Sequence, residues 1–156
     1  MILAACDKDD DNDVNDTDRI YVTMAGLSNN AEIMAGQVAA SKGNTAIVKA
    51  FAQHMITEHT TAQTDLKSRA SALGLSAPDT VDAEHKALMI RLNSLNGYSF
   101  DTAYINSQVK DHAKTIDVFN VEINGGNNSS IRGFAVDNLP HIQMHYNRAD
   151  SIRKAL

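Results

Sequence analysis

Apolar residues recur at alternating intervals of three and four along most of the chain, which is the spacing of an amphipathic helix. In the first such stretch they are Ile20, Met24, Leu27, Ala31, Met34 and Val38. Three further stretches follow, and Gly, Asn or Pro residues separate them. The pattern therefore predicts four long helices, over about residues 17–43, 45–74, 100–124 and 131–152.

The links between these helices differ in length. Residues 75–99 form a long connection that contains a shorter helical pattern from about Asp82 to Leu95, whereas the other two links are short. No strand-like alternation competes with the helical spacing. We therefore predict an all-α fold, a ferritin-like four-helix bundle with a long crossover containing a short extra helix between helices two and three. Pro140 should kink the fourth helix or mark a local restart.

The start of the chain has a different composition. Leu3-Ala4-Ala5-Cys6 resembles a bacterial lipobox, and a mostly acidic run follows it up to Asp18. Such a run cannot bury apolar surface and repels itself, so it should be an extended linker. The expected division is a lipobox remnant and disordered linker over residues 1–17, followed by a single helical domain over residues 18–156.

The lipobox predicts a lipid anchor on Cys6, and with it an outer-membrane lipoprotein in the envelope of a Gram-negative bacterium, facing the periplasm or the cell surface. The basic and apolar parts of a signal peptide are missing before it, so either the chain is truncated at its start or the match is accidental. In the second case Cys6 is an incidental residue of a disordered terminus.

The net charge of -5 is concentrated in the linker. Residues 7–18 hold seven Asp and one Lys, and the rest of the chain carries 13 Lys and Arg against 12 Asp and Glu. Because basic and acidic residues are nearly equal in number, the domain has no excess of positive charge that would attract nucleic acid. We therefore expect no nucleic-acid partner.

Three of the predicted apolar seams contain a histidine where an apolar residue is expected. His59, His112 and His145 lie on the second, third and fourth long helix, each near the middle. All three should point into the core at similar depth. Neutral imidazole binds Fe, Cu and Zn, so the sequence predicts a candidate site for one of these metals.

Two glutamates accompany these histidines. Glu32 lies on a face of small residues in the first helix, where a carboxylate has room to turn inward, and Glu58 directly precedes His59. Glu58 flanks the seam, as a partner of a ligand or as a ligand reaching across. The chain has four Glu and no Glu-x-x-His motif, so the standard di-iron site is not expected.

The same histidines allow two other interpretations. They could form a polar core layer that is hydrogen-bonded without metal, or they could line a small-ligand or catalytic pocket. His54 and His141 lie one turn before Glu58 and His145 and could join the site through i, i+4 spacing. The chain has no hydrolase nucleophile motif, phosphate loop or Cys-x-x-Cys, so none of these chemistries is expected. An oxidoreductase with a mononuclear or degenerate dinuclear metal centre is the remaining enzymatic alternative and ranks last.

Several short motifs together resemble one family. They are Ala31-Glu32-Ile33 with Gly36 and Ala39; Val48-Lys49, Phe51-Ala52, Met55 and Glu58-His59; Phe100-Asp101, Tyr104, Gln108-Val109 and His112; and Leu139-Pro140 with His145. Over about residues 18–155 the chain resembles the bacterial "predicted outer membrane protein" domain of unknown function. The resemblance implies a ferritin-like bundle in the envelope with no established activity. Glu58 stands where that family usually has Asp, and either carboxylate could serve.

The resulting prediction is an exported envelope lipoprotein whose bundle core binds a transition metal. Its metal-site residues are Glu32, Glu58, His59, His112 and His145. The alternative is a purely structural or partner-binding envelope module with a polar core layer and no metal. The expected partner is the membrane, through the anchor on Cys6; the sequence identifies no protein partner and is compatible with a homo-oligomer.

Overall fold

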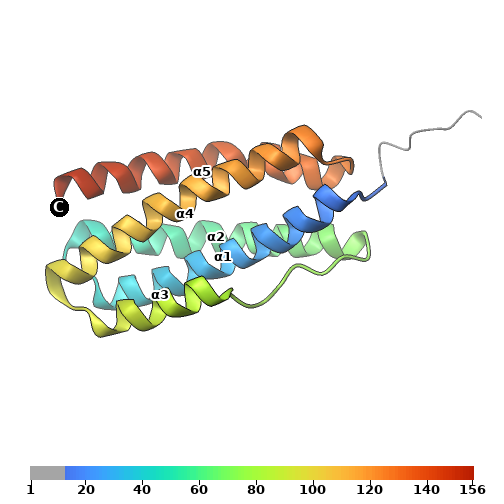
Figure 1. Cartoon of the computed structure of the whole chain (residues 1–156). Helices are drawn as coiled ribbons and strands as arrows, with labels where there is room; N and C mark the ends of the chain where they lie inside the picture. The colour runs from blue at the N-terminus through green and yellow to red at the C-terminus, as the bar shows by residue number, and fades with distance from the viewer. Residues whose placement is uncertain (1–12) are drawn as a thin grey trace, which may run out of the picture.

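The computed structural model describes residues 13–156, which form five helices and no strand (Figure 1). The helices are α1 (Asp16–Lys42), α2 (Ala46–Ala72), α3 (Ala83–Ser94), α4 (Gly97–Gly125) and α5 (Ser129–Ala155). The predicted all-α class is confirmed. Cys6 and most of the acidic run lie outside the described residues.

The four long helices form a bundle, and the short α3 lies along its outside. α1 packs on α2, α4 packs on α5, and contacts of α1 with α4 and of α2 with α5 close the ring. Neighbours α1 and α2 run in opposite directions, as do α4 and α5 (Figure 1). The predicted crossover is present: α3 returns the chain along the α1–α4 side, so that α2 and α4 run in the same direction.

Local capping signals explain the ends of α1 and α2. Asn15 caps α1 in a capping box, in which its side chain accepts the Asp18 N–H and the Asp18 carboxylate accepts the Asn15 N–H. Asp18 is thus the third residue of the first turn of α1. Thr45 caps α2, and Gly74 follows its end with a φ of 69°, a left-handed conformation that favours glycine.

α5 is continuous through Pro140, so the predicted local restart is wrong. Proline has no N–H and cannot bond the carbonyl one turn earlier, which belongs to Val136. Both Pro140 and Val136 are exposed, so the missing rung lies on the solvent side of the helix, where water can take the place of the donor. α4 begins at Gly97, slightly earlier than predicted.

The buried face of α1 is not the predicted one. Three members of the predicted seam are exposed: Ile20, Met24 and Met34. The face turned inward carries small and polar residues: Ala25, Asn29, Glu32, Ala35, Gly36 and Ala39. A Cβ on Gly36 would lie 2.9 Å from Ile56 Cγ1 and 3.1 Å from the Ala52 carbonyl oxygen of α2. Because α1 and α2 approach so closely, large side chains do not fit between them.

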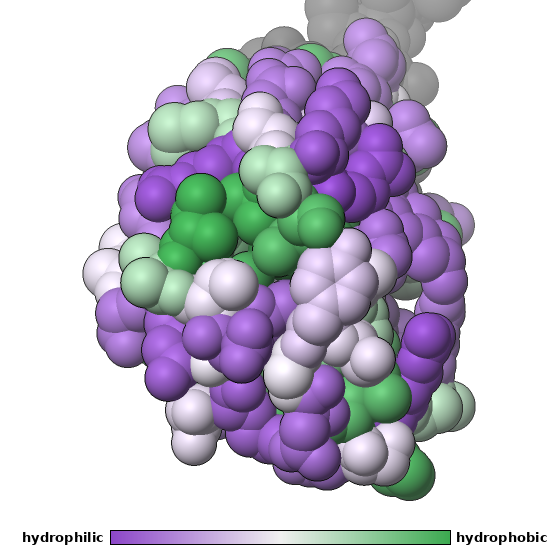
Figure 2. All heavy atoms as spheres, turned by 90° about the vertical axis from the view of Figure 1, so that its left-hand side faces the viewer, coloured by the Kyte–Doolittle hydropathy of each residue, from purple (hydrophilic) through white to green (hydrophobic). Residues whose placement is uncertain are grey.

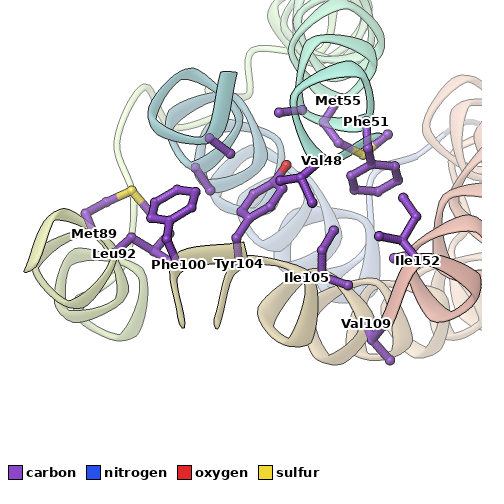
Figure 3. Packing of buried hydrophobic residues seen from close by; sticks show 14 residues of the cluster. Val48, Phe51, Met55, Met89, Leu92, Phe100, Tyr104, Ile105, Val109 and Ile152 are labelled. Carbon is purple, nitrogen blue, oxygen red and sulfur yellow. The ribbon is translucent and has the colours of Figure 1, made fainter. Parts of the chain in front are cut away.

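The hydrophobic core consists of two clusters, one toward each end of the bundle. Figure 3 shows the first, in which side chains from α2, α3, α4 and α5 point toward one another. Its labelled members are Val48, Phe51, Met55, Met89, Leu92, Phe100, Tyr104, Ile105, Val109 and Ile152. The second contains, among others, Tyr21, Leu66, Phe119, Ile131 and Phe134. A set of buried polar residues occupies the space between the clusters.

Two buried aspartates tie the helix connections at opposite ends of the bundle. Asp101 of α4 accepts the N–H groups of Asn44 and Thr45 at 2.7 and 2.9 Å, just before α2. Asp18 of α1 accepts the N–H of Asn128 at 3.2 Å, just before α5. Hydrogen bonds to a carboxylate are among the stronger ones in proteins, so each aspartate holds one helix start against another helix.

Figure 2 views the end of the bundle at which α2 and α4 begin. Hydrophobic side chains gather there in a patch with hydrophilic residues around it. Ile47 and Tyr98, which lie at the starts of α2 and α4, are 48% and 59% exposed. In the part of the chain that the structure describes, no helix is both long enough and apolar enough to cross a membrane.

Glu122 of α4 gives the fold a pH dependence that can be measured. Burial, and then the neighbouring Asp18 carboxylate, raise the pKa of Glu122 from 4.5 to about 8. A carboxyl group with a raised pKa in the folded state contributes stability below its unfolded pKa, and this contribution is lost as the pH rises through the folded value. Glu122→Gln should therefore gain stability relative to wild type between pH 5 and pH 8.5, by up to about 4 kcal/mol.

The measurement is the free energy of unfolding by urea at intervals across that pH range. Asp117→Asn removes an exposed carboxylate from the same helix and is the matched control, with a profile parallel to wild type. A constant difference between Glu122→Gln and wild type at all pH values would contradict the expectation.

Candidate metal centre

A layer of buried polar side chains crosses the middle of the bundle, between the two hydrophobic clusters. Its members are Asn29 and Glu32 of α1, His59 and Gln63 of α2, Gln108, His112 and Thr115 of α4, and His145 of α5. Each of the four long helices contributes to it. Burial of polar groups is costly unless they find partners, so the contacts of these side chains decide what the layer can do.

The three histidines predicted to share a layer come together. His59, His112 and His145 are each at most 2% exposed. Each offers a ring nitrogen such that the three nitrogens lie within 4.8 Å of one another. The ring centroids are 5.4 to 5.6 Å apart. Three imidazoles from three helices therefore surround one point in the core.

The outer nitrogens of His59 and His112 are held by hydrogen bonds. His59 Nδ1 donates to the side-chain oxygen of Asn29 on α1 at 2.9 Å. His112 Nδ1 donates to the main-chain carbonyl of Gln108, one turn earlier on α4, also at 2.9 Å. Both acceptors are oxygens without a proton, so in the neutral rings the N–H is on Nδ1 and the lone pair is on Nε2.

His145 is held in the opposite tautomer. Its Nε2 donates to Glu58 Oε2 of α2 at 3.1 Å, which leaves the lone pair on Nδ1. The remaining nitrogens, His59 Nε2, His112 Nε2 and His145 Nδ1, are buried and have no hydrogen-bond partner among residues 13–156. An unsatisfied buried polar group costs about 1–3 kcal/mol. Three such lone pairs in one layer are unusual for a purely structural core.

Burial also keeps the three rings uncharged. It lowers the pKa of His112 from 6.5 to about 4. Burial, and then the charge of His112, lower the pKa of His145 to about 4. Burial and the neighbouring imidazoles lower the pKa of His59 well below 6.5. At neutral pH all three rings are therefore neutral, the state in which imidazole binds metals.

Glu32 lies in the same layer but on the far side of His112. Its Oε2 accepts a hydrogen bond from Gln108 Nε2 at 2.6 Å, and its Oε1 is 3.6 Å from His112 Nδ1. Burial, and then the charge of Asp111, raise the pKa of Glu32 to about 8. The structure thus brings Glu32 to the outer edge of His112 and not among the three converging nitrogens.

Glu58 is on the outer side of the layer as well, between α2 and α5. Its side chain is 31% exposed and contacts His145, as described above. His54 Nε2 and His141 Nδ1 also approach its carboxylate, at 3.7 and 3.3 Å. The i, i+4 spacing considered in the sequence therefore does bring both histidines next to the site.

His85 of α3 has a different role from the three core histidines. Its Nδ1 lies 2.7 Å from Asp82 Oδ1, and its Nε2 lies 3.7 Å from Asp111 Oδ2 of α4. Asp111 and Asp82 raise the pKa of His85 to about 9. A protonated His85 therefore holds α3 against α4 on the side of the bundle opposite Glu58.

Sequence reasoning missed Asn29 as the partner of His59. The error follows from the wrong face of α1, because the large apolar side chains were assigned to the core. The stripe of small residues around Glu32 was a usable signal, since Asn29 lies on the same stripe one turn earlier. Gln108 was named only in the family resemblance, and its two contacts could not be inferred from spacing.

NMR of the metal-free protein should distinguish the three core histidines from His85. In a titration from pH 5 to pH 9, the rings of His59, His112 and His145 should remain neutral because burial lowers their pKa values, and His85 should stay protonated until about pH 9. Ring 15N shifts report the protonation state and the tautomer of each ring. Loss of one resonance in His85→Gln assigns that ring, and a core histidine that titrates near 6.5 would contradict the expectation.

Comparison with known proteins agrees with the helical fold. The chain is similar to the crystal structure of a DUF305 fragment from Deinococcus radiodurans, with a TM-score of 0.81 at 8% sequence identity, over 92% of this chain and 99% of that one. So low an identity shows a common fold alone. No curated protein sequence matches the chain. Residues 4–152 match the family described as "Domain of unknown function (DUF4142)", and the chain therefore belongs to that family.

Proposed function

We propose that this protein binds one divalent transition-metal ion at the centre of its bundle, through His59 Nε2, His112 Nε2 and His145 Nδ1. The observation that carries the proposal is the meeting of three buried imidazoles in one layer, each with one nitrogen that has no partner among the described residues. A metal ion would take up all three at once. It would remove the cost of leaving them unsatisfied.

The hydrogen bonds around the layer support this assignment over a polar layer without metal. Histidine ligands in metalloproteins usually donate their other N–H to a carboxylate, a carbonyl or water, which fixes the ring and its tautomer. Here Asn29, the Gln108 carbonyl and Glu58 provide those acceptors. In a layer built only for structure, the inner nitrogens would be expected to find partners as well.

The donor set also limits the choice of metal. Three neutral imidazoles suit zinc, copper or iron, and they do not suit the hard cations Ca2+ and Mg2+. Three protein ligands leave a further coordination position. Glu32 and Glu58 were both predicted to be metal-site residues. In this proposal Glu58 orients His145, and Glu32 accepts a hydrogen bond from Gln108 beside His112 and is not a ligand.

Metal retention tests the site directly. The full chain with Cys6→Ser, which removes the thiol, is purified without a histidine tag and equilibrated separately with limiting Zn2+, Cu2+ and Fe2+. At least one of these metals should be retained tightly at one equivalent. Replacing His59 and His112 together with Gln should weaken that binding by about 100-fold or more, since changing even an outer hydrogen-bond partner costs about 10- to 100-fold.

His85→Gln is the matched control, because His85 is a half-buried histidine outside the layer, and it should retain the metal as wild type does. At a free metal concentration of 100 times the Kd, binding to the folded state should also stabilise the protein by about 2.7 kcal/mol. Thermal unfolding with and without chelator would detect this difference. Equal retention by wild type and the double variant would refute the proposal.

We further propose that this bundle has the ferritin-like connectivity and serves in the bacterial envelope, anchored to the outer membrane by a lipid on Cys6. The parallel course of α2 and α4 after a long crossover supports the first part, because ferritin-like bundles have one such connection. The lipobox-like Leu3-Ala4-Ala5-Cys6 and the acidic run after it support the second part.

The anchor has its own test. Protein extracted with detergent from the source membranes should yield an N-terminal peptide that begins at Cys6 and carries the added mass of a diacylglyceryl group and a fatty acid. Mass spectrometry of the digested protein measures this. A peptide that contains unmodified Cys6 together with the residues before it would exclude the anchor and leave the metal site unaffected.

A further inference from the structure

We infer that His54, Glu58 and His141 form a second, solvent-facing cation site between α2 and α5, from which a divalent transition metal is passed to the inner histidines. The role in loading rests on the proposed inner site. Cation binding at the outer site does not.

The first support is the geometry around Glu58. Two pairs of residues at i, i+4 spacing face each other across the α2–α5 contact: His54 and Glu58 on α2, and His141 and His145 on α5. Glu58 lies at their centre, with Oε1 3.7 Å from His54 Nε2 and Oε2 3.3 Å from His141 Nδ1. The ligand atoms that lie within 4.8 Å of one another come from His54, Glu58 and His145, and His141 adjoins this group through its approach to Glu58.

The second support is an unused nitrogen. His54 Nε2 is covered although its side chain is 30% exposed, and it has no hydrogen-bond partner among the described residues. It is too far from Glu58 for a normal hydrogen bond. One carboxylate and two imidazoles provide two nitrogen ligands and one oxygen ligand. Zinc and copper bind such a set better than calcium, which prefers oxygen ligands.

The third support is a continuous decrease in exposure from the solvent to the core. The side chain of His141 is 56% exposed, Glu58 is 31% exposed, and His145 is 2% exposed. A surface cavity of about 270 Å³ lies beside this path and is lined by Glu58, His141 and Asp65, among others. An ion can therefore reach Glu58 directly from solvent, attracted by carboxylates.

His145 connects the two sites. Its Nε2 faces Glu58 and its Nδ1 belongs to the inner group, so one imidazole ring separates an ion on Glu58 from the inner lone pairs. The opposite side of the bundle is covered by α3 and held by His85. The α2–α5 side, which α3 leaves uncovered, is therefore the side on which the inner site can be loaded.

Zinc binding to four versions of the full chain tests both statements, all in the Cys6→Ser background. They are wild type, the outer variant His54→Asn with His141→Asn, the inner variant His59→Gln with His112→Gln, and the combination of the two pairs. Calorimetry gives the number of Zn2+ equivalents and their Kd values, and stopped-flow transfer from a chromophoric chelator gives the loading rate. Circular dichroism verifies that each variant is folded, and His85→Asn is the matched single control.

Wild type should bind two equivalents, one tight and one weaker. The outer variant should keep the tight equivalent with a Kd within about tenfold of wild type, because the ring of His54 lies next to that of His145 and substitutions there are coupled to the inner site. It should load that equivalent at least about tenfold more slowly, because the ion is no longer held next to His145 before it enters the core. The inner variant should keep the weaker equivalent, and the combined variant should bind neither.

The possible failures are distinguishable. An outer variant that binds two equivalents, or an inner variant that binds none, overturns the outer site and leaves the inner site standing. An inner variant that keeps a tight equivalent overturns the proposed function, while loss of the weaker equivalent in the outer variant still supports the outer site. An unchanged loading rate in an outer variant with one equivalent overturns the role in loading.

Discussion

The arrangement of this protein depends on the burial of three neutral imidazoles at the centre of a small helical bundle. Polar groups are stable in a core only when their surroundings satisfy them, and here each ring is satisfied on its outer side alone. This requirement involves all four long helices, because the acceptors come from α1, α2 and α4 and the rings from α2, α4 and α5. The register of the helices along the bundle axis is thereby fixed near the middle of each.

The two hydrophobic clusters and the two buried aspartates complete that arrangement. Each cluster fills one half of the bundle, and Asp18 and Asp101 fix the connections at opposite ends. The core between the histidine layer and each end of the bundle is therefore mainly apolar. The buried polar contacts described above lie in the layer, around Asp18 at one end and around Asp101 at the other. This separation limits the number of ways in which the helices can slide past one another, since a shift of one turn would place apolar side chains against the imidazoles.

The sequence was sufficient for the helices but not for every contact between them. The spacing of apolar residues and the Gly, Asn and Pro residues between the stretches predicted the long helices, the crossover and the shared depth of His59, His112 and His145, because these depend on local signals and on helical periodicity. The face of α1 was wrong because close packing on α2 favours small residues over large apolar ones, and this depends on the distance between two helices. The acceptors of the ring nitrogens likewise depend on tertiary contacts that periodicity does not contain.

Pro140 lies in α5 between Val136 and His145. Because proline has no N–H, the main-chain hydrogen bond to the Val136 carbonyl is missing on the solvent side of the helix. A helix that lacks one main-chain hydrogen bond bends at lower energetic cost than a helix with all of them. The N-terminal half of α5 is held at Asn128, whose N–H donates to Asp18 of α1. His145 lies in the half of α5 that follows Pro140, so a bend at the proline would move its ring relative to those of His59 and His112 and change the spacing of the buried imidazoles.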